Sequence, residues 1–72
     1  MDDIDLVNQP PHYNQSDIEC IEAIEASMAK EAFEGYLKGN VLKYLWRYEK
    51  KGGKQDLDKA NLYLTKLRSI LE

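Results

Sequence analysis

Two adjacent glycines, Gly52 and Gly53, separate two stretches of this sequence that both have the period of an amphipathic helix. In residues 37–51 and again in residues 55–71, apolar side chains recur every three or four positions. Glycine tolerates the left-handed backbone conformation that commonly ends a helix, and two lysines before the pair complement the helix dipole. The sequence therefore predicts two helices joined by a Gly-Gly turn and packed as an antiparallel hairpin.

The predicted core of the hairpin is formed by apolar side chains at helical spacing. They are Leu37, Val41, Leu45 and Tyr48, widened by Leu42 and Trp46, and then Leu57, Ala60, Leu64, Leu67 and Leu71, widened by Leu62, Tyr63 and Ile70. Gly35 and Gly39 each cost roughly 1 kcal/mol against Ala inside a helix. We therefore expect the long middle helix to be kinked near Gly35 to Gly39.

A first helix is predicted to precede the hairpin. Residues 16–19 match the capping box, in which serine and glutamate satisfy free amides, so the helix should begin at Asp17. Its apolar stripe is Ile18, Ile21, Ile24 and Met28. Cys20, beside Ile21, is interpreted as a small core residue, since a thiolate nucleophile needs an adjacent base or a lowered pKa.

The predicted architecture is all-α, with three main helices. Residues 1–15 contain Pro10 and Pro11 and have no helical period, so they should form an extended N-terminal arm, and residues 16–72 should form one helical domain. A chain of 72 residues is near the size at which one core outweighs chain entropy. We therefore expect a homo-oligomer.

Composition and charge exclude several classes of function. The net charge is -3, which gives no overall field toward nucleic acid, and the acidic first helix would repel a phosphate backbone. No apolar run approaches the roughly 20 residues that cross a bilayer, and the acidic N-terminus does not match a signal peptide. We expect a cytoplasmic protein with no membrane partner and rank nucleic acid last among partners.

Basic side chains gather on one edge of the predicted middle helix. Lys43, Arg47 and either Lys50 or Lys51 recur at helical spacing, with Asn40 before them and Tyr44 beside them. The start of the last helix offers unpaired amides beside the glycine pair, and together these groups could hold a phosphate. The alternative is a solvated charged face and a glycine helix cap. The turn is not a P-loop, because GxxxxGK followed by Ser or Thr is absent.

His12 and a row of glutamates are further candidates for catalysis or metal binding. His12 has the only side chain with a reference pKa near neutrality, so it is a candidate for proton transfer or for a phosphate contact, and otherwise for packing. Glu19, Glu22 and Glu25 form a row that could ligate magnesium if a second carboxylate cluster lay opposite. No such cluster is evident, so the row is interpreted as a solvated acidic face and no metal site is predicted.

Aromatic residues are numerous for so short a chain. Tyr13 or Tyr44 could stack on a nucleobase while neighbouring cations hold its phosphates. The alternative is that large rings complete a small core or an oligomer interface, and this interpretation is preferred for Trp46.

These motifs resemble a short bacteriophage-encoded domain of unknown function. The shared elements are His12-Tyr13-Asn14, Ile18 to Ile21, Ile24 to Ala26, Lys38 to Asn40, Lys43 to Arg47, Lys50 to Gly53, Asp56-Leu57, Lys59-Ala60 and Tyr63-Leu64. Some longer phage proteins with a similar domain are described as nucleotide kinases, so the resemblance implies a connection with nucleotides or phosphates in infected cells. The polar site residues that it implies are His12, Tyr13, Asn40, Lys43, Tyr44, Arg47, Lys51, Gly52, Gly53, Asp56 and Lys59.

Together these observations predict a small phage protein that binds a nucleotide or another phosphorylated metabolite at the basic edge and the Gly-Gly turn. The setting would be phage nucleotide metabolism or evasion of nucleotide-signalled defence in the infected bacterial host cell. One alternative is a nucleotide kinase or phosphohydrolase, with His12 or Asp56 as acid or base and magnesium held by carboxylates. Another is a protein that binds and inhibits a host protein.

Overall fold

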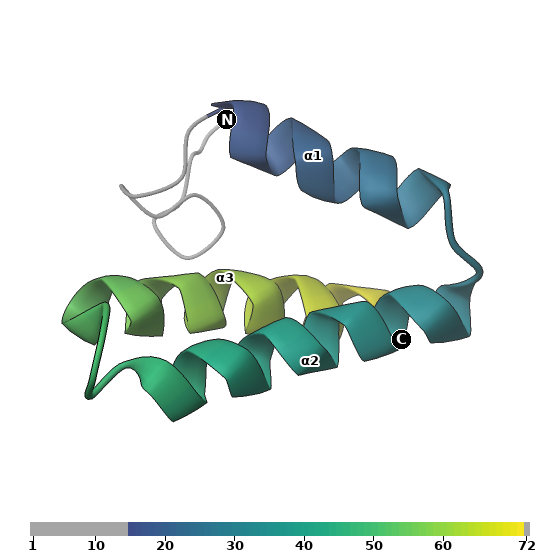
Figure 1. Ribbon diagram of the computed structural model, residues 1–72. Helices are drawn as coiled ribbons and strands as arrows, with labels where there is room; N and C mark the ends of the chain where they lie inside the picture. The colour runs from purple at the N-terminus through teal and green to yellow at the C-terminus, as the bar shows by residue number, and fades with distance from the viewer. Residues whose placement is uncertain (1–14, 72) are drawn as a thin grey trace.

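A computed structural model describes residues 15–71 of the chain, and side chains from Ile18 onward, as three α-helices (Figure 1). Helix α1 spans Gln15–Ala26, α2 spans Lys30–Arg47 and α3 spans Gly53–Ile70. Residues 15–71 contain no strand, so the predicted all-α class with three main helices is confirmed. The predicted N-terminal arm lies outside the described residues, except that its last residue, Gln15, belongs to α1.

Helices α2 and α3 run antiparallel and pack along their length as the predicted hairpin (Figure 1). Helix α1 lies across one side of this hairpin and contacts it less extensively. An ion pair joins α1 to α3, with Lys66 Nζ 3.0 Å from Glu25 Oε1. Both side chains are partly exposed, so this pair contributes at most about 1 kcal/mol.

The helix boundaries differ from the predicted ones. Helix α1 begins two residues before the predicted start, which places Ser16 inside the helix rather than at its cap. The helical conformation is interrupted at residues 27–29. There the Ser27 hydroxyl donates to the Ile24 carbonyl oxygen at 2.8 Å, and the backbone of Ala29 is extended. Helix α2 is then continuous through both of its glycines, and the kink predicted near Gly35 to Gly39 stays a prediction.

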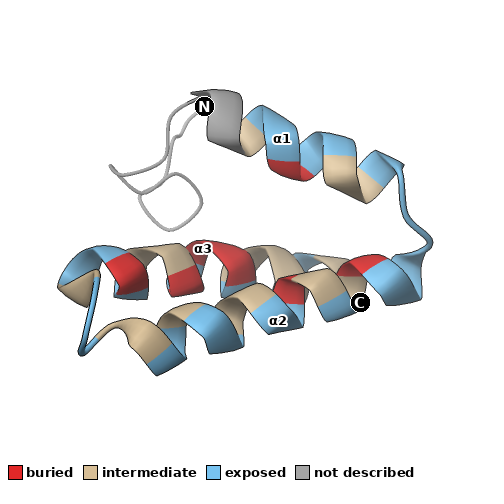
Figure 2. Cartoon of the chain, viewed as in Figure 1, coloured by how far each residue is buried: buried red, intermediate tan, exposed pale blue. Residues whose placement is uncertain are grey.

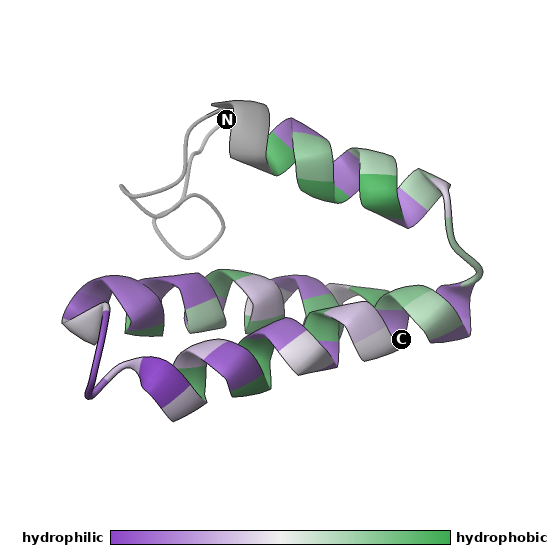
Figure 3. Ribbon diagram, viewed as in Figure 1, coloured by the Kyte–Doolittle hydropathy of each residue, from purple (hydrophilic) through white to green (hydrophobic). Residues whose placement is uncertain are grey.

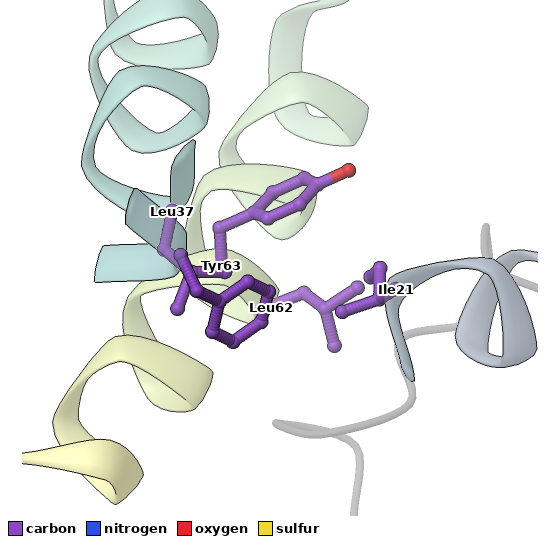
Figure 4. Packing of buried hydrophobic residues seen from close by; sticks show 5 residues of the cluster. Ile21, Leu37, Leu62 and Tyr63 are labelled. Carbon is purple, nitrogen blue, oxygen red and sulfur yellow. The ribbon is translucent and has the colours of Figure 1, made fainter. Parts of the chain in front are cut away.

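The core lies where the three helices meet (Figure 2). Its buried members are Ile21, Phe33, Leu37, Leu62 and Tyr63, with Ile18, Ile24, Tyr36, Val41, Tyr44, Leu67 and Ile70 packed around them. Ile21 projects from α1 toward Leu62 of α3 (Figure 4). Leu37 is fully buried, and burying a leucine side chain stabilises a fold by roughly 1.5–3 kcal/mol.

Several predicted core positions are wrong. Seven large apolar side chains are exposed, and they are Met28, Leu42, Leu45, Trp46, Leu57, Leu64 and Leu71. The core forms instead where Ile21 of α1 packs with Leu62 and Tyr63 of α3, and none of the seven exposed side chains belongs to that cluster. Cys20 is also exposed, because the next residue in a helix points about 100° away and the core contact of α1 falls on Ile21.

Hydrophobic segments alternate with hydrophilic ones along each of the three helices (Figure 3). This alternation is the helical period expected of amphipathic helices. Among the described residues, none of the helices combines the length and apolar character needed to cross a membrane.

The packing predicts that replacing Leu37 and replacing Leu71 with Ala cost very different amounts of unfolding free energy. Replacing the fully buried Leu37 with Ala should reduce the free energy of unfolding by roughly 2–5 kcal/mol, because it leaves a cavity. The same change at Leu71, which is 51% exposed, should cost about 0.5 kcal/mol or less. Urea unfolding followed by circular dichroism measures both values, and equal losses would contradict the described core.

Candidate anion-binding site

The turn between α2 and α3 is closed by backbone hydrogen bonds. The amides of Lys50 and Lys51 both donate to the Arg47 carbonyl oxygen at 3.0 Å, and the Gly53 amide donates to the Tyr48 carbonyl oxygen at 2.8 Å. Helix α2 therefore ends at Arg47, four residues before the predicted end at Lys51. Gly53 has a φ of 55°, which is the left-handed conformation expected of this glycine pair, and α3 begins at that residue.

A side-chain interaction ties the end of α2 to the start of α3. Arg47 Nε donates to Asp56 Oδ2 at 3.0 Å, and Arg47 Nη2 donates to Asp56 Oδ1 at 3.3 Å. The Gly52 amide donates to the same Oδ2 at 2.9 Å. We refer to Arg47, Gly52 and Asp56 as the hairpin latch. Because a guanidinium group matches both oxygens of a carboxylate, the latch fixes direction as well as distance.

Hydrogen bonds and nearby positive charge favour the ionised form of Asp56 in this latch. Its side chain is only 1% exposed, whereas that of Arg47 is 36% exposed. The hydrogen bonds from Arg47 are the main cause that lowers the pKa of the Asp56 carboxyl, with a further contribution from the Gly52 amide, and burial opposes them. The same hydrogen bonds raise the pKa of Arg47. A carboxylate held in this way is a structural group rather than a free general base.

Gly52 is required by the close approach of Asp56. A Cβ atom at position 52 would overlap the Asp56 carboxyl group. The two glycines of the turn therefore have different roles, since Gly52 gives room for the carboxylate and Gly53 supplies the left-handed backbone.

Three described cations lie around one aromatic ring beside the latch. The Nζ atom of Lys43 is 4.5 Å from the centroid of the Tyr44 ring, Arg47 Cζ is 5.0 Å away and Lys59 Nζ is 5.5 Å away. We refer to these four residues as the Tyr44 cluster. Cations within about 6 Å of a ring centroid are attracted by the negative face of the ring. The ring thus holds positive charge from both hairpin helices at one place.

The Tyr44 ring is supported by a row of aromatic side chains. It stacks on Tyr63 with centroids 5.9 Å apart, and Tyr63 meets Tyr36 edge-on at 6.1 Å. Tyr36 in turn stacks on Phe33 at 5.8 Å. Burial, followed by a side-chain hydrogen bond with Tyr63, raises the pKa of the Tyr36 hydroxyl. Because this row extends into the core, the position of Tyr44 is set by packing.

The structure brings together only some of the predicted site residues. Lys43, Tyr44 and Arg47 converge as expected, and Lys59 joins them from α3. Lys51 is exposed in the turn and is not one of the cations around the ring. The side-chain amide of Asn40 donates to the Tyr36 carbonyl oxygen at 2.9 Å, within its own helix.

The glycine pair and Asp56 belong to the latch, while His12 and Tyr13 lie outside the described residues. Sequence reasoning missed the pairing of Asp56 with Arg47 and the contact of Lys59 with Tyr44. Both follow from the register of the hairpin. Once the turn is placed at residues 48–52, an antiparallel helix returns Asp56 to Arg47 and Lys59 to the level of Tyr44.

Other polar features of the described residues lie away from this cluster. A pocket of about 330 Å³ is lined by Glu25, Met28, Lys30, Phe33 and Ile70, at the end of the hairpin opposite the turn. Among the side chains that the structure describes, no three from His, Cys, Asp or Glu lie close enough to share a metal ion. Glu19 and Glu22 are exposed on α1, and Glu25 pairs with Lys66.

Comparison with known proteins identifies the family. Residues 7–65 match the family described as a protein of unknown function, DUF3310, and the chain therefore belongs to it. Its sequence is 46% identical over 65 residues to that of "Nucleotide kinase gp1.7" of Escherichia phage T7, and this match covers 83% of the chain. It is also 48% identical over 54 residues to "Gene 1.7 protein" of Enterobacteria phage T3, which covers 74% of this chain.

The chain spans 33% of the length of each of these two relatives. No solved structure matches the chain. The resemblance to a phage domain family is thus confirmed, and the longer relatives include one that is named as a nucleotide kinase.

The latch predicts how stability depends on pH. Because the folded pKa of Asp56 is lowered, its stabilisation is fully present above the ordinary value near 3.8 and is lost as pH falls through the folded pKa. We expect Asp56→Asn to be less stable than the parent at neutral pH and to lose less stability on acidification. Urea unfolding across this pH range, with Glu22→Gln as a control, measures the difference. Parallel pH profiles for parent and Asp56→Asn would contradict the latch.

Proposed function

We propose that this DUF3310 chain binds a nucleotide or another phosphorylated small molecule at the Tyr44 cluster. The observation that carries the proposal is the convergence of three cations from two helices within 5.5 Å of one ring centroid. Like charges gathered around one ring repel each other, and a bound anion would relieve the repulsion. A phosphate group, with several charged oxygens, suits a site that combines ammonium and guanidinium donors.

Each cation has a distinct part in the proposed site. Arg47 is held by the latch through two of its N–H groups, so its remaining N–H groups have a fixed direction. Lys43 and Lys59 approach from α2 and α3 and act as more mobile point charges. The cluster therefore combines one rigid donor with two adaptable ones, which is suited to phosphate oxygens on a flexible ligand.

Tyr44 has a different role here from the base stacking that the sequence analysis considered. Its ring already stacks on Tyr63 and attracts the three cations. We infer that Tyr44 is the platform that positions positive charge, and that the phosphate rather than the base supplies most of the binding free energy. The name of the phage T7 relative supports a nucleotide as the ligand class. Action in phage nucleotide metabolism or counter-defence, inside the infected host cell, is the corresponding role.

The alternative is a phosphoryl-transfer enzyme, and the name of the phage T7 relative favours it. This function would require a second phosphate site and, in ordinary kinase chemistry, magnesium held by carboxylates or substrate phosphates. In the described residues, Asp56 is engaged in the latch, so it is poorly placed to act as the acid or base.

Binding is tested by isothermal titration against nucleoside mono-, di- and triphosphates, the matching nucleosides and inorganic phosphate. We expect phosphorylated compounds to bind and nucleosides to bind far more weakly. Lys43→Ala and Lys59→Ala should each raise Kd about tenfold, which corresponds to loss of about 1.4 kcal/mol. Lys54→Ala, an exposed lysine outside the cluster, is the matched control. A double variant at positions 43 and 59 that binds as tightly as the parent would eliminate the proposed site.

Turnover separates the binding protein from the enzyme. The whole chain is incubated with ATP, magnesium and each nucleoside monophosphate, and products are measured by chromatography. If the chain only binds the ligand, product forms no faster than in the same mixture without protein. Product formation that EDTA abolishes and that Lys59→Ala reduces would instead assign phosphoryl transfer to this chain.

A further inference from the structure

The side of α2 that faces away from Leu37 carries an unusual set of residues. Trp46 is 90% exposed and Leu42 is 55% exposed, and both glycines of the helix are also exposed. Positions 35, 39, 42 and 46 are separated by four, three and four residues, so they form one stripe along the helix. We refer to Gly35, Gly39, Leu42 and Trp46 as the outer stripe.

Nothing in the described chain explains this composition. Apart from the neighbouring backbone of α2 itself, no described atom lies within 4 Å of a Cβ built on Gly35 or Gly39, so packing against the other helices does not require either glycine. Neither has the left-handed backbone found at Gly53. Each nevertheless costs roughly 1 kcal/mol against Ala. A helix that loses stability at two positions and exposes a tryptophan beside them is typical of a surface that is covered by a partner.

We propose that the outer stripe is the interface of a homodimer, in which α2 packs antiparallel against α2 of a second copy. In such an interface a two-fold axis pairs each position with another one in the same stripe. Gly35 and Trp46 are equally distant from the midpoint between residues 40 and 41, and so are Gly39 and Leu42. An axis through that midpoint places each large side chain of one protomer over a glycine of the other.

The exposed apolar area is close to the apolar share of such an interface. Trp46, Leu42 and the adjacent Leu45, which is 46% exposed, together present on the order of 400 Å² of surface, since a fully exposed aromatic side chain contributes about 150–250 Å². Each side of a standard interface buries roughly 800 Å², of which somewhat more than half is apolar. The glycines allow the two helix axes to approach closely.

The symmetric spacing is the reason to choose a second copy over a different protein. An unrelated partner would not require small and large residues to be mirrored about one point of the helix. The proposal is also independent of the anion site, because it does not involve Tyr44, Arg47 or Lys59.

Sedimentation equilibrium of the whole chain tests the proposal. We expect a dimer whose dissociation constant rises at least about tenfold in Trp46→Ala and in Gly35→Leu. Gly35→Leu should still fold, because the position is open and leucine favours a helix, and circular dichroism checks this. The double variant Gly35→Leu/Trp46→Ala again places a large residue opposite a small one. It should recover much of the affinity that each single change removes.

Three results would overturn the proposal. The first is a parent chain that stays monomeric at high micromolar concentration. The second is a dimer that Trp46→Ala leaves intact but Leu64→Ala dissociates, since Leu64 is an exposed residue of α3 and lies outside the outer stripe. The third is a double variant whose loss of affinity is the sum of the two single losses, because that excludes the antiparallel pairing of positions 35 and 46.

Discussion

Asp56 is a buried carboxylate at the first turn of α3, and its burial is tolerated only because Arg47 and the Gly52 amide surround it with donors. This latch sets the register of α3 against α2. The register then places Lys59 beside Tyr44 and stacks Tyr63 on the same ring. The candidate anion site is therefore a consequence of how the hairpin closes, and it would be lost if α3 shifted along α2.

Different interactions stabilise the two ends of the hairpin. Near the turn, charged and aromatic groups are held by directional contacts, while the buried apolar side chains of α2 and α3 meet Ile21 of α1 farther along. The cations of the Tyr44 cluster are gathered around an aromatic ring, and Arg47 alone of the three is fixed by the latch. An aromatic ring attracts cations without neutralising them, so Lys43 and Lys59 keep their charge for a ligand, while the charge of Arg47 is paired with Asp56.

The sequence was sufficient to predict the class, the helical hairpin and the convergence of Lys43, Tyr44 and Arg47, because local periodicity and glycine chemistry determine these features. It was insufficient for the orientation of α3. The leucine seam through Leu57 and Leu64 has the stronger pattern, yet Asp56 and Tyr63 are buried, since the latch and α1 decide which side of α3 turns inward. Hydrophobic periodicity shows which face of a helix is the most apolar. It does not reveal that a charged residue such as Asp56 is buried in an ion pair.

The central claim is that the Tyr44 cluster is where a phosphorylated ligand binds. Amide chemical-shift mapping by NMR, during titration of the whole chain with a nucleotide and with its nucleoside, tests it most directly. We expect the nucleotide, but not the nucleoside, to shift the signals of Lys43, Tyr44, Arg47 and Lys59. Shifts that instead centre on the pocket lined by Glu25, Phe33 and Ile70, or that the nucleoside reproduces in full, would contradict it.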